Sequence, residues 1–185
     1  MKYRIAAAII VLASTPALAL DFPLVLQLKF SPWGGINADE DEFESGSSDN
    51  YKRYDMTFDD SYSGRILVGP VYVSHQQSNA TIEGDIDAEV STIAIGVAGI
   101  NYDVYESQHG TYLMGGVGIG QGTFTFADNN ATKEQESMVE ANAETGMRVA
   151  EHLLMGAGVD FQHFGNFGES KASSWTFYIS TGLVF

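Results

Sequence analysis

The chain has 185 residues, a formal net charge of −15 and no cysteine. This length suits one domain, and the lack of cysteine excludes disulfides, thiolate metal sites and a lipid-bearing cysteine. With 44% hydrophobic residues, 18% charged residues and 20 glycines, a disordered chain is excluded as well. A surface this acidic repels phosphate backbones, so we expect no nucleic-acid binding and favour cations or basic surfaces as partners.

The first residues are typical of a secretory signal peptide. Lys2 and Arg4 precede a short apolar stretch, which leads to the small-residue cleavage site Ala17-Leu18-Ala19. The apolar stretch is too short for a membrane-spanning helix, which needs about 20 residues. We therefore predict a cleaved signal peptide over residues 1–19 and one β-barrel domain over residues 20–185.

From residue 22 onward, apolar and polar residues mostly alternate, a period that is typical of β-strands. Polar and glycine-rich gaps separate eight predicted strands, at residues 22–33, 51–60, 64–74, 90–102, 111–126, 137–149, 153–164 and 174–185. The gaps alternate between long and short, as the outer loops and inner turns of bacterial outer-membrane barrels do. The sequence therefore predicts an all-β fold, an eight-stranded antiparallel transmembrane up-and-down β-barrel.

The composition of the two strand faces indicates which face meets lipid. In strand 111–126, the polar face carries four glycines, at positions 116, 118, 120 and 122. Glycine weakens a solvated strand but suits the crowded interior of a narrow barrel, so we expect the apolar face to point toward lipid. A soluble ligand carrier would turn its apolar face inward instead.

Charged side chains are expected inside this barrel. Because buried charges persist only when they are paired, we favour a closed salt-bridge network over a gated polar path. The residues concerned are Lys29, Arg53, Asp55, Asp59, Glu140, Glu144, Arg148 and Asp160.

Aromatic residues near the predicted strand ends match the two interfacial girdles of membrane barrels. The loop-side set is Trp33, Tyr51, Tyr72, Phe124, Phe126, Phe164 and Trp175, and the turn-side set is Phe22, Phe58, Tyr112 and Phe185.

The last predicted strand alternates apolar residues up to Phe185, with Phe177, Ile179 and Leu183 on the same face. This ending resembles the insertion signal of bacterial outer-membrane barrels. The glycine-rich stretches 111–120 and 144–161 are similar to those of the small barrel group that includes the opacity proteins, OmpX and OmpA. The resemblance implies an outer-membrane location, and it implies that the barrel-assembly machinery recognises these four residues.

A possible hydrolase site lies in the predicted loop 75–89, where Glu83 could orient His75 and His75 could activate Ser78. The run faintly resembles the His-x-Ser-Asn motif of outer-membrane lipid A deacylases. Here, however, two residues rather than one separate His75 from Ser78, and in a strand that spacing puts the side chains on opposite faces. A lipid A hydrolase is therefore the alternative function.

The predicted loop 34–50 is rich in carboxylates, which attract Ca²⁺ and Mg²⁺. The candidate cation-binding residues are Asp39, Glu40, Asp41, Glu42 and Glu44. They lack the spacing of a known calcium loop, so a solvated charge run is the favoured interpretation. The histidines show no metal-ligand spacing and the glycines form no phosphate-binding motif, so no resident metal or cofactor is expected.

These observations together predict a structural or surface-interaction protein of the outer membrane, without an open pore. Its expected partners are outer-membrane lipid and lipopolysaccharide, the barrel-assembly machinery, and divalent cations or host and cell-surface molecules that contact acidic loops.

Overall fold

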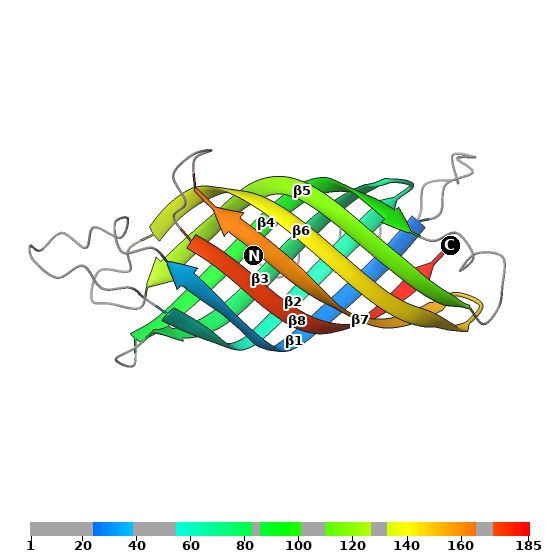
Figure 1. The fold of residues 1–185 in the computed structure, drawn as a ribbon, viewed down its shortest axis with the longest axis horizontal. Coiled ribbons are helices and arrows are strands. Elements are labelled where there is room, and N and C mark those ends of the chain that lie inside the picture. Colours follow the sequence, from blue (N-terminus) through cyan, green and yellow to red (C-terminus); the bar gives the residue numbers. More distant parts are fainter. Residues whose placement is uncertain (1–23, 39–54, 83–85, 101–109, 127–132, 166–171) are drawn as a thin grey trace, which may run out of the picture.

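The computed structural model describes residues 24–38, 55–82, 86–100, 110–126, 133–165 and 172–185. In this part of the chain, eight antiparallel strands form a closed barrel in which β1 pairs with β8 (Figure 1). The strands are β1 (Leu24–Ala38), β2 (Asp55–Val68), β3 (Val71–Ile82), β4 (Ile86–Ile100), β5 (Thr111–Phe126), β6 (Lys133–Ala150), β7 (Leu153–Phe164) and β8 (Ala172–Val184). The predicted eight-stranded antiparallel barrel is confirmed. The described residues contain no helix that is long and apolar enough to cross a bilayer.

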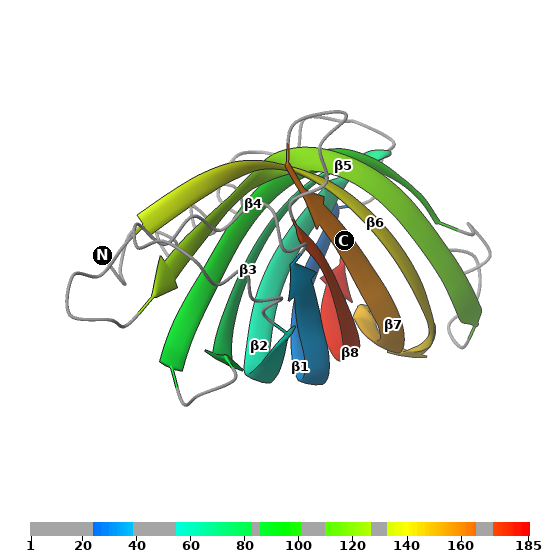
Figure 2. The same ribbon diagram turned by 60° about the vertical axis from the view of Figure 1, so that its left-hand side comes forward.

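The two ends of the barrel differ. The start of β1 and the end of β8 lie at the same end, where the backbones of Leu24 and Phe185 exchange hydrogen bonds of 3.2 and 2.9 Å (Figure 1). This end carries the two-residue turns Gly69–Pro70 and Glu151–His152, and we call it the turn end and the opposite one the loop end. Outer-membrane barrels point their short turns toward the periplasm. Figure 2 shows how the strands tilt and curve around the barrel.

The hairpin of β2 and β3 differs from the sequence-based prediction. The predicted turn at 61–63 lies inside β2, and the true turn is Gly69–Pro70, where Gly69 has a φ of 57°. Glycine adopts this left-handed conformation without strain. Ser61 is a small polar residue that is buried inside the barrel, which is why this segment looked like a turn. As a consequence, residues 75–82 belong to β3 rather than to a loop.

Large apolar side chains cover the outside of the barrel, as the sequence predicted. Water would penalise such a surface, whereas the hydrocarbon of a bilayer accepts it. The most exposed members of this apolar belt are Leu28, Trp33, Ile93, Ile95, Val97, Leu113, Val117, Ile119, Ile179 and Phe185.

Asp59 was predicted to lie inside, but its side chain is exposed, and Phe58 is buried instead. A register irregularity between Phe58 and Asp60 accompanies this change of facing in β2. Arg53 lies outside the described residues, and so does the side chain of Asp55.

The side chains of the predicted girdle residues Trp33, Trp175 and Phe185 are exposed, whereas the girdle prediction is wrong for five other aromatics, which are buried. The side chains of those five fill the barrel interior, because the ends of a narrow barrel are packed rather than open. They are Phe58, Tyr72, Tyr112, Phe124 and Phe164. Phe22 and Tyr51 and the side chain of Phe126 lie outside what the structure describes.

Glycines on the inner face make room for buried tyrosines. A Cβ added to Gly96 on β4 would lie 2.5 Å from Tyr72 Cζ, and one added to Gly158 on β7 would lie 2.5 Å from Tyr178 Oη. Real Cβ atoms essentially never approach other atoms so closely. On β5 the predicted inward glycines are confirmed, because a Cβ added to Gly118 would lie 2.5 Å from Tyr72 Oη and one added to Gly122 would lie 2.5 Å from Phe164 Cε1. These glycines make room for bulky rings against the inner wall.

The lipid-facing assignment predicts a strong position dependence for arginine on β5. Val117→Arg places a charge in the middle of the apolar belt and should lower the free energy of unfolding by about 2–4 kcal/mol. Gln121→Arg, four residues closer to the loop end on the same face, should cost about 0–1 kcal/mol. Urea unfolding in lipid vesicles measures both. Equal costs would contradict the assignment.

The packing of glycine against tyrosine predicts a contrast within β4. Gly96→Ala should cost about 1–3 kcal/mol because the added methyl group overlaps the Tyr72 ring and the Val117 carbonyl. Gly99→Ala should change stability by less than about 0.5 kcal/mol, because nothing lies within 4 Å of its added Cβ. The same unfolding measurement compares the two variants. An equal loss in both variants would contradict the assignment of the cost to contact with the Tyr72 ring, because the smaller entropy of the unfolded alanine chain favours folding at both positions.

Candidate functional site

The inward side chains change in kind from the turn end to the loop end. On β1 the order is Val25, Gln27, Lys29, Ser31 and Ile36, all of them buried. A similar order occurs on β7, where apolar Leu154, charged Asp160, neutral polar Gln162 and apolar Phe164 follow one another, without a counterpart to Gln27. The interior therefore consists of four stacked layers.

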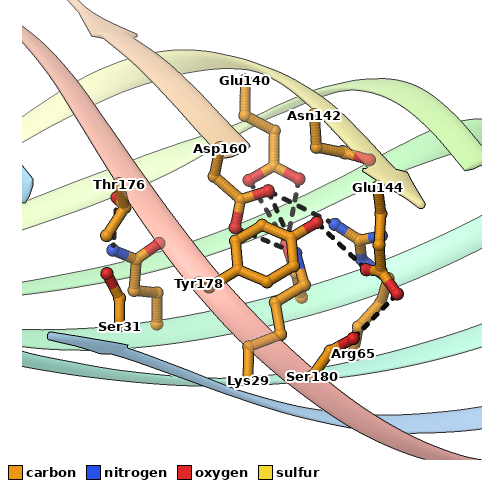
Figure 3. Close-up of polar contacts among 12 residues, drawn as sticks. Lys29, Ser31, Arg65, Glu140, Asn142, Glu144, Asp160, Thr176, Tyr178 and Ser180 are labelled. Carbon is orange, nitrogen blue, oxygen red and sulfur yellow. Dashed lines mark hydrogen bonds and ion pairs between the residues drawn. The ribbon is translucent and has the colours of Figure 1, made fainter. Parts of the chain in front are cut away.

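The charged side chains of the interior form one layer, which we call the ionic layer, and Asp160 lies at its centre (Figure 3). Lys29 Nζ donates to both carboxylate oxygens of Asp160, at 3.0 and 2.9 Å, and Arg65 Nη2 lies 3.5 Å from Asp160 Oδ1. Both cations also lie against aromatic rings, with Lys29 Nζ 4.0 Å from the centroid of Tyr178 and Arg65 Cζ 5.0 Å from that of Tyr72. One carboxylate on β7 thus holds together basic residues from β1 and β2.

Glu144, in the same layer, is stabilised by neutral donors. Gln27 Nε2 donates to Oε1 at 2.6 Å, Ser180 Oγ to Oε1 at 2.8 Å, and Tyr178 Oη to Oε2 at 3.0 Å. Tyr112 also donates its hydroxyl to Oε1. Several such hydrogen bonds let a buried carboxylate persist without a cation beside it.

Glu140 lies two inward positions closer to the loop end on β6, beyond the buried Asn142, and accepts a hydrogen bond from Ser74 Oγ at 3.1 Å. Within the described interior, the layer therefore combines three carboxylates with two cations: Glu140, Glu144 and Asp160 with Lys29 and Arg65.

The next layer contains neutral amides and hydroxyls. Gln76 Nε2 donates to Ser61 Oγ at 3.0 Å and to Ser78 Oγ at 3.1 Å. Gln162 Nε2 donates to Gln76 Oε1 at 3.1 Å, which links β7 to β3 across the lumen. A cavity of ≈ 10 Å³ between this layer and the ionic layer has room for about one water molecule.

Apolar plugs close both ends of the polar layers. In the loop-end plug, Phe124 and Phe164 pack edge to face, with ring centroids 5.0 Å apart. Its members are Ile36, Phe58, Ala80, Ala88, Val90, Ala94, Phe124, Met138, Phe164 and Ala172. The turn-end plug consists of Val25, Leu67, Tyr72, Ala98, Ile100, Tyr112, Met114, Leu154 and Val184. Among the described residues, the polar layers therefore lie between two apolar clusters.

The sequence predicted part of the ionic layer. Lys29, Glu140, Glu144 and Asp160 are buried as expected. Arg148 is instead half-buried beside the β6–β7 turn, where its Nε donates to the carbonyl of Glu151 at 2.7 Å.

Arg65 was missed because the predicted strand 64–74 ran through the Gly69–Pro70 turn. Counting alternate residues back from that turn would have placed Leu67 and Arg65 on one face, and both are buried.

The structure does not bring the candidate hydrolase residues together. Ser78 and His75 both lie on β3, but Ser78 is buried and donates to Ser61 Oγ at 2.8 Å, whereas His75 points outward. His75 Nδ1 lies 2.8 Å from the carbonyl oxygen of Thr92 on β4. Their side chains therefore lie on opposite sides of the barrel wall. Glu83 lies outside the described residues.

Asp39, Glu40, Asp41, Glu42 and Glu44 also lie outside the described residues. Among the residues that are described, no group of three or more histidine and acidic side chains could hold a metal ion. The residues of the predicted assembly signal have exposed side chains: Phe177, Ile179 and Leu183 on β8, and Phe185 directly after it.

No protein-family model and no curated protein sequence matches the chain. The fold is nevertheless similar to solved structures. The outer membrane protein OprG from Pseudomonas aeruginosa is 12% identical and has a TM-score of 0.56, over 89% of this chain and 96% of its own. Neisserial surface protein A (NspA) is 10% identical with a TM-score of 0.52, over 86% of this chain and 96% of its own.

The fold is thus that of the small eight-stranded outer-membrane barrels, the group that the sequence resembles. The apolar belt gives the physical reason for a membrane location, because its side chains surround a polar and charged interior. The protein is a barrel of the bacterial outer membrane.

The ionic layer predicts a large effect of removing the charge at its centre. Asp160→Asn leaves Lys29 and Arg65 buried without their carboxylate and should lower the free energy of unfolding by about 3–5 kcal/mol. Asp59→Asn, on the exposed face of β2, is the matched control and should change it by less than about 0.5 kcal/mol. Urea titration in vesicles measures the free energy of unfolding of both variants. A small effect of Asp160→Asn would mean that other groups neutralise Lys29 and Arg65.

The placement of β3 predicts that Ser78 acts through stability. Ser78→Ala removes hydrogen bonds to two buried partners and should cost about 1–2 kcal/mol, while His75→Ala should cost less than about 0.5 kcal/mol. Mass spectrometry of lipid A from cells that express either variant should match the wild type. Fatty-acid release by the wild type that Ser78→Ala abolishes would contradict this and support the hydrolase.

Proposed function

We propose that this protein is a non-conducting surface protein, whose barrel is an anchor and whose loop end makes the functional contacts. The observation that carries the proposal is the closed interior, in which apolar plugs lie on both sides of the ionic and amide layers. An eight-stranded barrel is just wide enough for side chains to fill it. With the lumen filled, function must lie on the outer surface or at the ends of the barrel.

Acidic side chains on the outer face of β2–β4 indicate the kind of partner. Near the loop end, Asp59 accepts a hydrogen bond from Thr81 Oγ1 at 2.8 Å, and Asp60 accepts one from Asn79 Nδ2 at 2.7 Å. On β4, Glu89 accepts one from Gln77 at 3.2 Å. These polar pairs replace the apolar belt, so this part of the wall extends beyond the hydrocarbon.

The predicted acidic run 39–44 would add further negative charge at the same end of the barrel. We propose that the loop end attracts divalent cations that bridge to lipopolysaccharide phosphates, or basic groups on host and cell-surface molecules. Long-range attraction between opposite charges supports this choice of partner.

Export and assembly complete the proposal. We propose that residues 1–19 are removed after export, and that the outward face of β8, with Phe177, Ile179, Leu183 and Phe185, is recognised by the barrel-assembly machinery. The exposure of these four side chains leaves them available for such contact.

The closed interior is tested by conductance. Purified protein in a planar lipid bilayer should show no steady open channel in either orientation, because permeation requires displacement of both plugs. An outer-membrane porin in the same bilayer is the positive control. Stable channels of wild-type protein would overturn the proposal.

The loop-end role is tested separately by Ca²⁺-dependent binding to lipopolysaccharide vesicles. The variant D39N/E40Q/D41N/E42Q/E44Q should lose most of the Ca²⁺-dependent part of the binding. The variant D103N/E106Q, in a predicted turn on the opposite side of the membrane, should keep it. Equal binding by both variants would refute a role for the acidic run.

A further inference from the structure

The outer wall of the barrel contains an apolar groove of ≈ 510 Å³. It crosses β5, β6, β7 and β8 and ends on β1. The outward side chains that line it are Pro32, Trp33, Leu113, Ala143, Thr145, Ala157, Val159, Phe177 and Ile179.

The groove results from a change of side-chain size between paired strands. Leu113 pairs with Thr145, Thr145 with Ala157, and Ala157 with Ile179, so two small residues lie between two large ones. The neighbouring row differs, because Gly115 pairs with Ala143, Ala143 with Val159 and Val159 with Phe177, so side-chain size increases toward β8. The floor of the groove is therefore low over β6 and β7, with Leu113 on the β5 side and with Phe177 and Ile179 on the β8 side.

The β1 end of the groove is shaped by an irregularity in the pairing of β1 with β8. The register shifts between Phe30 and Trp33. Ser31 Oγ is a hydrogen-bond donor to the carbonyl oxygens of Trp33 and Phe177. Trp33 is 69% exposed and borders the groove on the loop-end side of Lys29. Tryptophan favours the headgroup level of a bilayer, so this end of the groove opens near the loop-side leaflet.

We infer that the groove binds one acyl chain of lipid A from the loop-side leaflet of the outer membrane. The groove is continuous with the apolar belt, so hydrocarbon already surrounds it. Its volume is within the range of about 300–1,000 Å³ that is typical of sites for single small molecules. Its lining runs obliquely across five strands, from Trp33 on β1 to Leu113 near the turn end of β5, a path that suits an extended chain. This inference does not depend on cation binding at the loop end.

The experiment is native mass spectrometry of full-length protein in detergent, with purified hexa-acyl lipid A or a dipalmitoyl phospholipid added. Ala157→Leu and Ala143→Leu fill the groove, whereas Ala141→Leu adds the same bulk to an exposed position on β6 that does not line it. Wild type and Ala141→Leu should retain one lipid A molecule. The two groove variants should retain about tenfold less, and the phospholipid should bind more weakly to all four proteins.

Trp33 provides a second measurement if a groove variant folds poorly. The chain has two tryptophans, so Trp175→Phe leaves Trp33 as the only one. Lipid A with brominated acyl chains should quench its fluorescence at a lower mole fraction than a brominated phospholipid does. Equal lipid A retention by all variants would overturn the inference, and so would a preference for phospholipid. A dimer of the wild type that the groove variants abolish would also overturn it, because the groove would then bind a second copy of the chain.

Discussion

The structure depends on one constraint, namely that the hydrocarbon of a bilayer offers the backbone no hydrogen-bond partner. Each strand must therefore pair on both sides, and the β1–β8 pairing closes the sheet. Closure at eight strands leaves a lumen so narrow that side chains must fill it. The layered interior and the apolar exterior both follow from this.

Filling the lumen with charge requires that each charge has a partner. Asp160 binds Lys29 and Arg65, and four neutral donors surround Glu144. The tyrosines that reach these carboxylates fit only because glycines on neighbouring strands leave space, as Gly158 does for Tyr178. Glycine placement and buried charge are thus parts of one arrangement, and that arrangement leaves the outer surface and the loop end as places for function.

The sequence predicted the fold well because period two, inward glycines and outward aliphatic residues all arise from the membrane constraint. It placed the β2–β3 hairpin wrongly, because Ser61 and Ser63 look the same in a turn as in a crowded lumen, while Gly69–Pro70 lies between apolar residues. The facing errors at Asp59 and Phe58 have another cause, the register irregularity between Phe58 and Asp60, which alternation along one strand does not reveal. The groove was not predictable, because it depends on which residues of four strands are paired, and register is not visible in one strand.

The most direct test of the closed interior uses the absence of cysteine from the chain, which allows single-cysteine variants without background. Thr176→Cys and Ser180→Cys place thiols on the buried face of β8, and Phe185→Cys places one on the exposed face at the turn end. In folded protein in vesicles, a charged water-soluble thiol reagent should label only the Phe185→Cys variant, and all three should be labelled after unfolding in urea. Rapid labelling of the folded Thr176→Cys or Ser180→Cys variant would show a water-filled lumen and contradict the account.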